Sequence, residues 1–223
     1  GMIMLFRIDP QVFYKQLLWF ALGIFIFLVT SIATRHWVEL SISPNILFAA
    51  TALLLLSPLL VGVEHGGSKS WIDFPYFSFQ PSEPAKITFS LFLARTLEGE
   101  ELEKPWVFLA QMAVVLGLLA GAKDLGGAML FYTTALALVF TASSRWEYLG
   151  LGIGGGGVAA IIGYLAFSHV KIRVQAWLNP WQDVAGGGYQ IIQSLLAMAS
   201  GGFFGTGLGL GRPDIIPVVT SDF

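Results

Sequence analysis

Long apolar runs alternate with short polar connections along most of the chain. Six such runs lie at about residues 16–34, 45–63, 81–97, 106–122, 125–142 and 147–168. A hydrocarbon core about 30 Å thick is crossed by about 17–25 apolar residues in an α-helix. The pattern therefore predicts an all-α fold, a polytopic membrane helix bundle with about six transmembrane spans. We expect no sheet of consequence, beyond a two-residue hairpin in a loop.

The pattern changes after residue 168, where no further long apolar run follows. Residues 189–198 mix polar and apolar positions at helical spacing, with Ile191, Leu195 and Met198 on one face. Glycines then recur through residues 201–211. We predict a short helix that lies at the membrane interface or dips into a cavity, followed by a glycine-rich loop.

Composition supports the membrane interpretation and excludes several kinds of site. Hydrophobic residues make up 55% of the chain and charged residues 12%, with a mean hydropathy of +0.72. A soluble domain carries roughly twice that charged fraction. A net charge of −2 argues against a nucleic-acid partner, and the lack of cysteine excludes disulfides. The three histidines lie in separate connections without metal-ligand spacing.

Six spans return the chain to its starting side, so the N-terminus, the connection at 64–80 and everything after His169 share one side. That side holds six of the lysines and arginines and the opposite side holds four. The positive-inside rule alone would place the first side in the cytoplasm. The same cations could instead hold an anionic substrate.

Two pairs of charged residues lie close to apolar runs. Glu83 and Lys86 are three residues apart on a predicted helix, so they can pair, and we expect both to face the protein interior. The pair is either structural, or Lys86 holds a phosphate while Glu83 orients it. Asp124, after Lys123, either caps the helix from Leu125 or contacts a substrate or ion.

Glycines crowd the sixth run, where Gly150 and Gly154 have the spacing that permits close helix approach. We interpret them as sites of tight packing within the chain, or of a bend, rather than as a dimer interface.

Several motifs together resemble one family. They are Gly-Ser-Lys-Ser-Trp-Ile at 67–72, Phe-Gln-Pro-Ser-Glu-Pro-Ala-Lys at 79–86, Asp-Leu-Gly at 124–126, Asn-Pro-Trp-Gln-Asp at 179–183, Gly-Gly-Phe-Phe-Gly-Thr-Gly at 201–207 and Ser-Asp-Phe at 221–223. In this order they resemble the SEDS proteins, the FtsW, RodA and SpoVE proteins of bacterial division, elongation and sporulation. The chain departs from the family pattern at Lys123, where proline is usual, at Ser70, where arginine is common, and at residues 218–221.

The resemblance implies a ten-helix fold of which this chain supplies roughly helices two to seven. It implies one SEDS-type transmembrane domain at 1–223, incomplete, with a helix bundle at 16–168 and an extracytoplasmic loop at 169–223. We therefore expect a fragment that continues past Phe223. The resemblance implies a multi-pass plasma-membrane protein in which the side that holds the N-terminus and the segment after His169 lies outside the cytoplasm. The count of lysines and arginines favours the opposite orientation, and we follow the resemblance.

The resemblance also implies a function. Family members are peptidoglycan glycosyltransferases that polymerise lipid II into glycan strands, and their partner is a class B penicillin-binding protein. The family's essential aspartate falls on Asp222, our candidate general base. Cations, or a divalent metal, can stabilise the departing pyrophosphate. The candidate substrate-binding residues are Lys86, Glu83, Trp71, Arg173 and Arg212, with Trp71 in the wall of the cavity.

Two other functions remain open. Charged groups near buried helix ends also suit a lipid II flippase, and a non-catalytic scaffold of the cell-wall synthesis complex would need no chemistry. The sequence establishes no cofactor, and a divalent cation is the one candidate.

Overall fold

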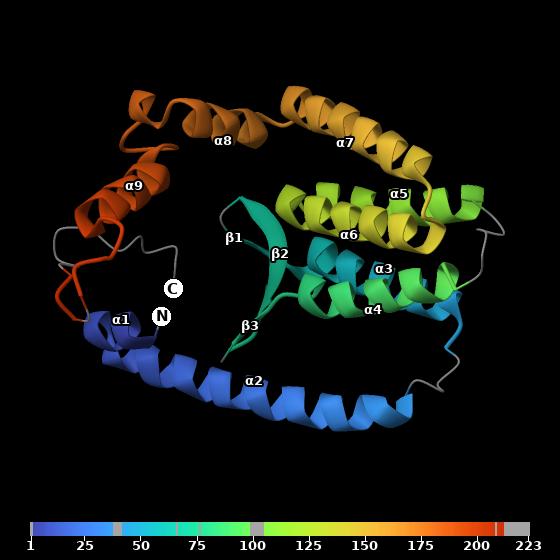
Figure 1. Ribbon diagram of the computed structural model, residues 1–223, viewed down its shortest axis with the longest axis horizontal. Helices are drawn as coiled ribbons and strands as arrows, with labels where there is room; N and C mark the ends of the chain where they lie inside the picture. Colours follow the sequence, from blue (N-terminus) through green and yellow to red (C-terminus); the bar gives the residue numbers. More distant parts are fainter. Residues whose placement is uncertain are drawn as a thin grey trace. The chain divides into compact units, whose positions relative to one another are not determined.

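The computed structural model describes residues 2–37, 42–65, 67–75, 77–98, 105–207 and 209–211, which Figure 1 traces along the chain. The chain divides into two compact units. The first comprises Gly1–Leu40 together with Ser168–Phe223, and the second comprises Ser41–Phe167. The second unit therefore contains five of the six predicted helices.

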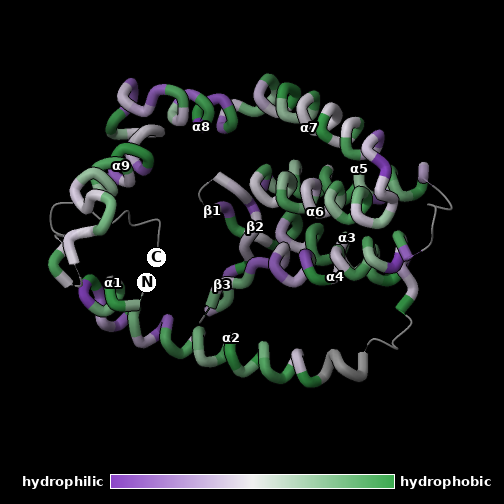
Figure 2. The backbone as a smooth tube through the Cα atoms, viewed as in Figure 1, coloured by the Kyte–Doolittle hydropathy of each residue, from purple (hydrophilic) through white to green (hydrophobic). Residues whose placement is uncertain are grey.

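All six predicted helices are present. They are α2 (Pro10–Trp37), α3 (Pro44–Val61), α4 (Ser82–Thr96), α5 (Pro105–Gly121), α6 (Leu125–Ser143) and α7 (Trp146–Ala166). Proline is the first helical residue of α2, α3 and α5, where its missing N–H would have no partner within the helix. The predicted all-α membrane bundle is therefore confirmed, and Figure 2 shows these helices to be largely hydrophobic along their lengths.

The helices differ in whether they are long enough to cross a bilayer. Among the described residues, α3, α6, α7 and Pro10–Ile32 of α2 are long and apolar enough to span. The apolar α5 has 17 residues, and α4 has 15. A rise of about 1.5 Å per residue makes α4 only about 22 Å long. The 15 residues of α4 are therefore fewer than a full span needs, whereas the 17 of α5 lie at the lower limit.

The core of the second unit lies where α3, α4, α5 and α6 meet. Its most deeply buried side chains include Leu55, Phe89, Val115 and Phe131, one from each helix. The ring centroids of Phe89 and Phe131 are 4.8 Å apart. Since lipid is as apolar as these residues, close packing stabilises the bundle more than removal from water does.

Two threonines join α3 to α4 inside this core. The hydroxyl oxygens of Thr51 and Thr88 are 2.8 Å apart, and Thr51 is fully buried. Each hydroxyl also contacts a backbone carbonyl oxygen of its own helix, at 2.9 Å for Leu47 and 3.1 Å for Ala85. Both polar groups are thus satisfied without water.

Helix α7 packs on α6 through glycine, but not through the predicted pair. A Cβ atom at Gly152 would lie 2.2 Å from Leu136, and one at Gly156 would lie 3.0 Å from Tyr132. Gly150 and Gly154 have nothing within 4 Å of that position. Close approach of α7 to α6 through glycine is therefore confirmed, but the choice of Gly150 and Gly154 is wrong. A shift of two residues along a helix turns a side chain by about 200°, so Gly150 and Gly154 face away from α6.

The connection between α3 and α4 forms a small antiparallel sheet of β1 (Val63–His65), β2 (Ser68–Asp73) and β3 (Ser78–Phe79), in that order. Val63 pairs with Trp71, and Ile72 pairs with Phe79. The expectation of no sheet beyond a two-residue hairpin is therefore wrong. Aromatic and β-branched residues favour strands, and Gly67 has the positive φ of 85° that the turn before β2 requires.

The first unit contains α1 (Met2–Ile8), α2, α8 (Ser168–Leu178), the short 3-10 helix η1 (Pro180–Gln182) and α9 (Tyr189–Gly201). The short helix predicted near residues 189–198 is confirmed by α9. Its exposed apolar side chains include Leu195 and Met198. Helix α8 lies in a segment predicted to be a loop. That prediction missed it because charged and aromatic residues interrupt its apolar pattern.

Candidate functional site

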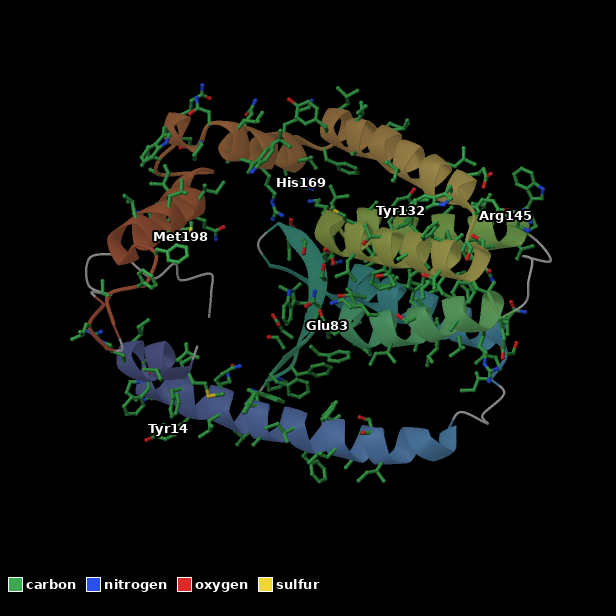
Figure 3. All side chains as sticks on the ribbon, viewed as in Figure 1. Tyr14, Glu83, Tyr132, Arg145, His169 and Met198 are labelled. Carbon is green, nitrogen blue, oxygen red and sulfur yellow. The ribbon has the colours of Figure 1, made fainter. Side chains whose placement is uncertain are left out.

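The candidate site begins where the sheet leads into α4. Strand β3 ends at Phe79, and Pro81 is the N-cap residue of α4. Pro81, Ser82 and Ala85 are buried, so one face of the first helical turn packs against the protein. Helical spacing directs Glu83 away from this face, and Figure 3 shows it at the end of α4 that adjoins the strands.

Glu83 and Lys86 form the predicted ion pair. The Lys86 ammonium donates to Glu83 Oε1 at 2.7 Å. The Glu83 side chain is 58% exposed and that of Lys86 is 34% exposed. Pairing is therefore confirmed, and the expectation that both face the interior is wrong for Glu83, because Ser82 and Ala85 occupy the inward face. Exposed pairs of this kind contribute little to stability, typically about 0–1 kcal/mol.

Trp71 enters the same unit on β2, where it is partly buried opposite Val63. The next residue along, Ile72, pairs with Phe79, and Phe79 precedes Glu83 by four residues. The sheet thus connects the strand of Trp71 directly to the helix that carries the ion pair. The two motifs are therefore adjacent through the pairing of β2 with β3.

Lys69, on β2, fastens the sheet to the helices. Its backbone N–H donates to the carbonyl oxygen of Ala122 at 2.8 Å, and its ammonium donates to the carbonyl oxygen of Leu59 at 2.9 Å. The second contact satisfies a carbonyl in the last turn of α3, where a cation also suits the helix dipole. Sequence reasoning assigned Lys69 only to a motif and missed this anchoring role.

The turn between α5 and α6 adjoins the sheet at a second point. The Lys123 ammonium lies 3.3 Å from Glu64 Oε1, although both side chains are more than half exposed. Lys123 has a φ of 58°, in the left-handed region that proline cannot adopt. The replacement of the family's usual proline by Lys123 thus accompanies a backbone shape that excludes proline. This contact joins residues 59 positions apart, so sequence reasoning missed it.

Asp124 caps α6. Its side-chain Oδ1 accepts a hydrogen bond from the backbone N–H of Gly127 at 2.8 Å. Its backbone carbonyl oxygen accepts one from the backbone N–H of Ala128 at 3.0 Å. The capping interpretation is confirmed. A Cβ atom at Gly127 would lie 2.5 Å from Asp124 Oδ2, so the glycine lets the carboxylate close over the helix end.

The remaining predicted residues lie elsewhere. Arg173 belongs to α8, in the other unit, and its side chain is exposed. Arg212 and Asp222 lie outside the described residues. Of the predicted residues that the structure describes, Glu83 and Lys86 are the two in direct contact. Among the residues that the structure describes, no group of three His, Asp or Glu side chains is arranged to hold a metal ion.

Comparison with known proteins gives consistent similarities. Residues 4–223 match the FTSW_RODA_SPOVE family model, described as cell cycle protein. The peptidoglycan glycosyltransferase RodA of Mycobacterium tuberculosis (strain ATCC 25618 / H37Rv) is 34% identical, over 94% of this chain and 49% of that protein. A probable peptidoglycan glycosyltransferase FtsW of Geobacter sp. (strain M18) is 35% identical, over 79% of this chain and 51% of its own. The chain thus spans about half the length of the curated relatives it matches.

Solved structures support the same relationship. One, described as structural coordination of polymerization and crosslinking by a peptidoglycan synthase complex, superposes with a TM-score of 0.67 at 31% identity, over 87% of this chain and 59% of that one. The crystal structure of the rod shape determining protein RodA of Thermus thermophilus gives a TM-score of 0.56 at 25% identity. The match covers 91% of this chain and 80% of that chain. The helix arrangement is therefore shared with these proteins.

Proposed function

Because the chain belongs to the FtsW/RodA/SpoVE family of cell cycle proteins, we propose that it is part of a peptidoglycan glycosyltransferase that polymerises lipid II. The family match over residues 4–223 carries this proposal. The matched relatives named as peptidoglycan glycosyltransferases support the same activity. The protein is a multi-pass bacterial membrane protein, so its lipid-linked substrate would reach it from the bilayer.

The proposed reaction joins two sugars and releases a pyrophosphate. The 4-hydroxyl oxygen of one disaccharide attacks the anomeric carbon of another, and the bond from that carbon to the lipid pyrophosphate breaks. Asp222 takes the hydroxyl proton as general base. The pyrophosphate leaves with the electron pair of the broken bond, and nearby cations stabilise its developing charge.

The α4 end of the second unit supplies a candidate for those cations. Lys86 is one-third exposed, and its ammonium has three N–H donors, of which the contact with Glu83 engages one. The amino-terminal end of α4 adds the positive end of a helix dipole. In this proposal Glu83 orients Lys86 toward a phosphate oxygen, and Trp71 forms the adjacent wall.

Asp222 is proposed as the base on the family motif alone. Arg173 and Arg212, cations of the segment after residue 168, are proposed as further pyrophosphate contacts. A divalent cation could share this work. The proposed crosslinking partner is a class B penicillin-binding protein. The similar solved structure of a peptidoglycan synthase complex that coordinates polymerization and crosslinking supports that partner.

Labelled lipid II supplied to the purified full-length protein tests the proposal. Glycan chains on a gel are the expected result, whereas movement of lipid II between leaflets without chains would indicate a flippase. If neither glycan chains nor movement of lipid II between leaflets is observed, the protein would be a scaffold. Asp222→Asn should lower the polymerisation rate about 10²–10⁴-fold, the usual effect of losing one positioned base.

Asp214→Asn is the matched control, since Asp214 has no counterpart in the family motif and should retain most of the rate. More than about a tenth of the wild-type rate in Asp222→Asn would contradict its assignment as base. Membrane insertion and binding to the crosslinking partner should be unchanged in both variants.

A further inference from the structure

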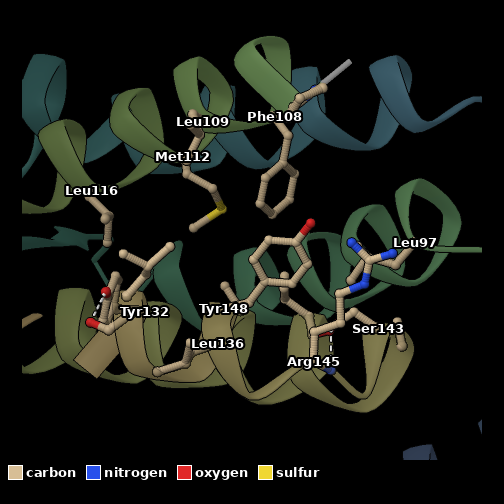
Figure 4. Close-up of a pocket in the computed structure, with 16 residues that line it drawn as sticks. Leu97, Phe108, Leu109, Met112, Leu116, Tyr132, Leu136, Ser143, Arg145 and Tyr148 are labelled. Atoms are coloured by element: carbon tan, nitrogen blue, oxygen red, sulfur yellow. Dashed lines mark hydrogen bonds between the residues drawn. The ribbon is translucent and has the colours of Figure 1, made fainter. Parts of the chain in front are cut away.

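A groove with one polar end runs between α5, α6 and α7, within the second unit. Its volume is about 560 Å³, inside the range of about 300–1,000 Å³ that is typical of ligand sites. Figure 4 shows Leu116 and Tyr132 toward one end and Leu97 and Arg145 toward the other. Apolar side chains line the stretch between them, among them Leu109, Met112 and Leu136.

The groove has the depth of one membrane leaflet. It follows α6 from Tyr132 to Ser143, a length of about 16 Å at about 1.5 Å per residue. Half of a hydrocarbon core of about 30 Å is about 15 Å. The groove therefore reaches from the end of the α6 span to about the middle of the bilayer, on the side opposite the Asp124 end of α6.

The deep end of the groove carries no unsatisfied hydroxyl. The Tyr132 hydroxyl donates to the carbonyl oxygen of Gly152 at 2.6 Å. Gly152 and Leu136 hold α6 and α7 close at this level. An acyl chain entering here would meet an apolar surface, because the local polar group is already paired.

The outer end carries groups suited to a phosphate. The guanidinium carbon of Arg145 lies 6.0 Å from the centroid of the Tyr148 ring, and the Arg145 side chain is exposed. The backbone N–H of Arg145 donates to the Ser143 hydroxyl at 3.4 Å. A guanidinium presents a planar set of N–H donors that matches phosphate oxygens, and its weak hydration suits the membrane interface.

We propose that this groove binds a phospholipid of the surrounding membrane, with one acyl chain along Met112 and Leu136 and the phosphodiester at Arg145. Glu147 follows Arg145 by two residues, and Glu98, which follows the groove-lining Leu97, is paired with Arg95 at 2.9 Å. Among the described residues at this end, Arg95 offsets Glu98 and Glu147 offsets Arg145, so no excess positive charge favours a headgroup with net negative charge. The expected headgroup is therefore zwitterionic, with its phosphate on Arg145. This site is separate from the proposed glycosyltransferase residues and does not depend on that activity.

Native mass spectrometry of the purified chain in detergent tests the proposal. The protein is titrated with phosphatidylethanolamine and with diacylglycerol that has the same two acyl chains. The wild type should bind the phospholipid about tenfold more tightly, because only that lipid offers charge-assisted hydrogen bonds to Arg145. Phosphatidylglycerol with the same chains should bind no more tightly than phosphatidylethanolamine.

Two variants separate the headgroup contact from the groove itself. Arg145→Gln should remove the preference for phospholipid over diacylglycerol, whereas Lys123→Gln, beyond the opposite end of α6, should retain it. Ala142→Trp should weaken binding of both lipids about tenfold or more by filling the outer end. Ala137→Trp, on the same helix but outside the groove, should not weaken binding.

Either of two results would overturn the proposal. One is an unchanged phospholipid preference in Arg145→Gln, which would remove the headgroup contact. The other is unchanged lipid binding in Ala142→Trp, which would place the lipid elsewhere. A dimer that binds no lipid and that Ala142→Trp dissociates would instead assign the groove to a second copy of the chain.

Discussion

Asp124 provides a direct measure of how much one helix cap stabilises this bundle. Its carboxylate accepts the N–H of Gly127 at 2.8 Å at the start of α6. Replacing an N-cap aspartate by alanine costs about 0.5–2 kcal/mol. Loss of its negative charge beside the positive end of the helix dipole costs a further 0.3–1 kcal/mol, approximately. Asp124→Ala should therefore lower the free energy of unfolding by about 1–3 kcal/mol.

Asp124→Asn is the informative control, because asparagine caps helices as well as aspartate does but carries no charge. It should lose only the dipole contribution, about 0.3–1 kcal/mol. The measurement is unfolding of the detergent-solubilised protein by sodium dodecyl sulfate in mixed micelles, followed by circular dichroism and extrapolated to zero denaturant.

Equal destabilisation by asparagine and alanine would refute the reasoning, since it would mean that the hydrogen bond to Gly127 contributes nothing. A loss below about 0.3 kcal/mol in Asp124→Ala would refute it as well. In the full-length protein, an Asp124→Asn variant that stays stable but loses polymerase activity would revive the substrate-contact interpretation.

Three further predictions concern backbone shape and packing, and each is measured with the same unfolding assay. Lys123→Pro should destabilise the protein by more than about 1 kcal/mol, because proline cannot adopt a φ of 58°, whereas Lys123→Gly should cost less than about 1 kcal/mol. Gly152→Leu should cost about 1–3 kcal/mol through overpacking, while Gly154→Leu, with nothing within 4 Å, should be tolerated. The variants Thr51→Val, Thr88→Val and the double variant form a double-mutant cycle, in which the coupling energy between the two threonines should be about 0.6 kcal/mol. A coupling energy of zero would contradict a stabilising contact at 2.8 Å.

Several features could be predicted from the sequence because their causes are local. A run such as residues 125–142 is apolar along its whole length, and a helix satisfies its backbone hydrogen bonds within the run itself. The cap at Asp124 is equally local, since it reaches only three residues along the chain. The same holds for the pairing of Glu83 with Lys86, which needs nothing beyond helical spacing.

Other features depend on segments that are distant in the sequence. The sequence offered Gly150 and Gly154 as well as Gly152 and Gly156 for the contact with α6. Only the rotation of α7 against Leu136 and Tyr132 selects the second pair. The contact between Lys123 and Glu64 joins residues 59 positions apart, so no local pattern predicts it.

The amino-acid sequence by itself determined the six long apolar helices, where the charged residues fall on them and which family motifs the chain carries. Hydrophobic length, helical period and residue identity are properties of each segment alone. Only the tertiary structure decided that Glu83 faces outward, that Lys69 fastens a three-stranded sheet to α3, and that the α5–α7 interface leaves a groove ending at Arg145. Those features follow from how helices rotate and approach one another. Close packing sets that arrangement through contacts between residues far apart in the chain.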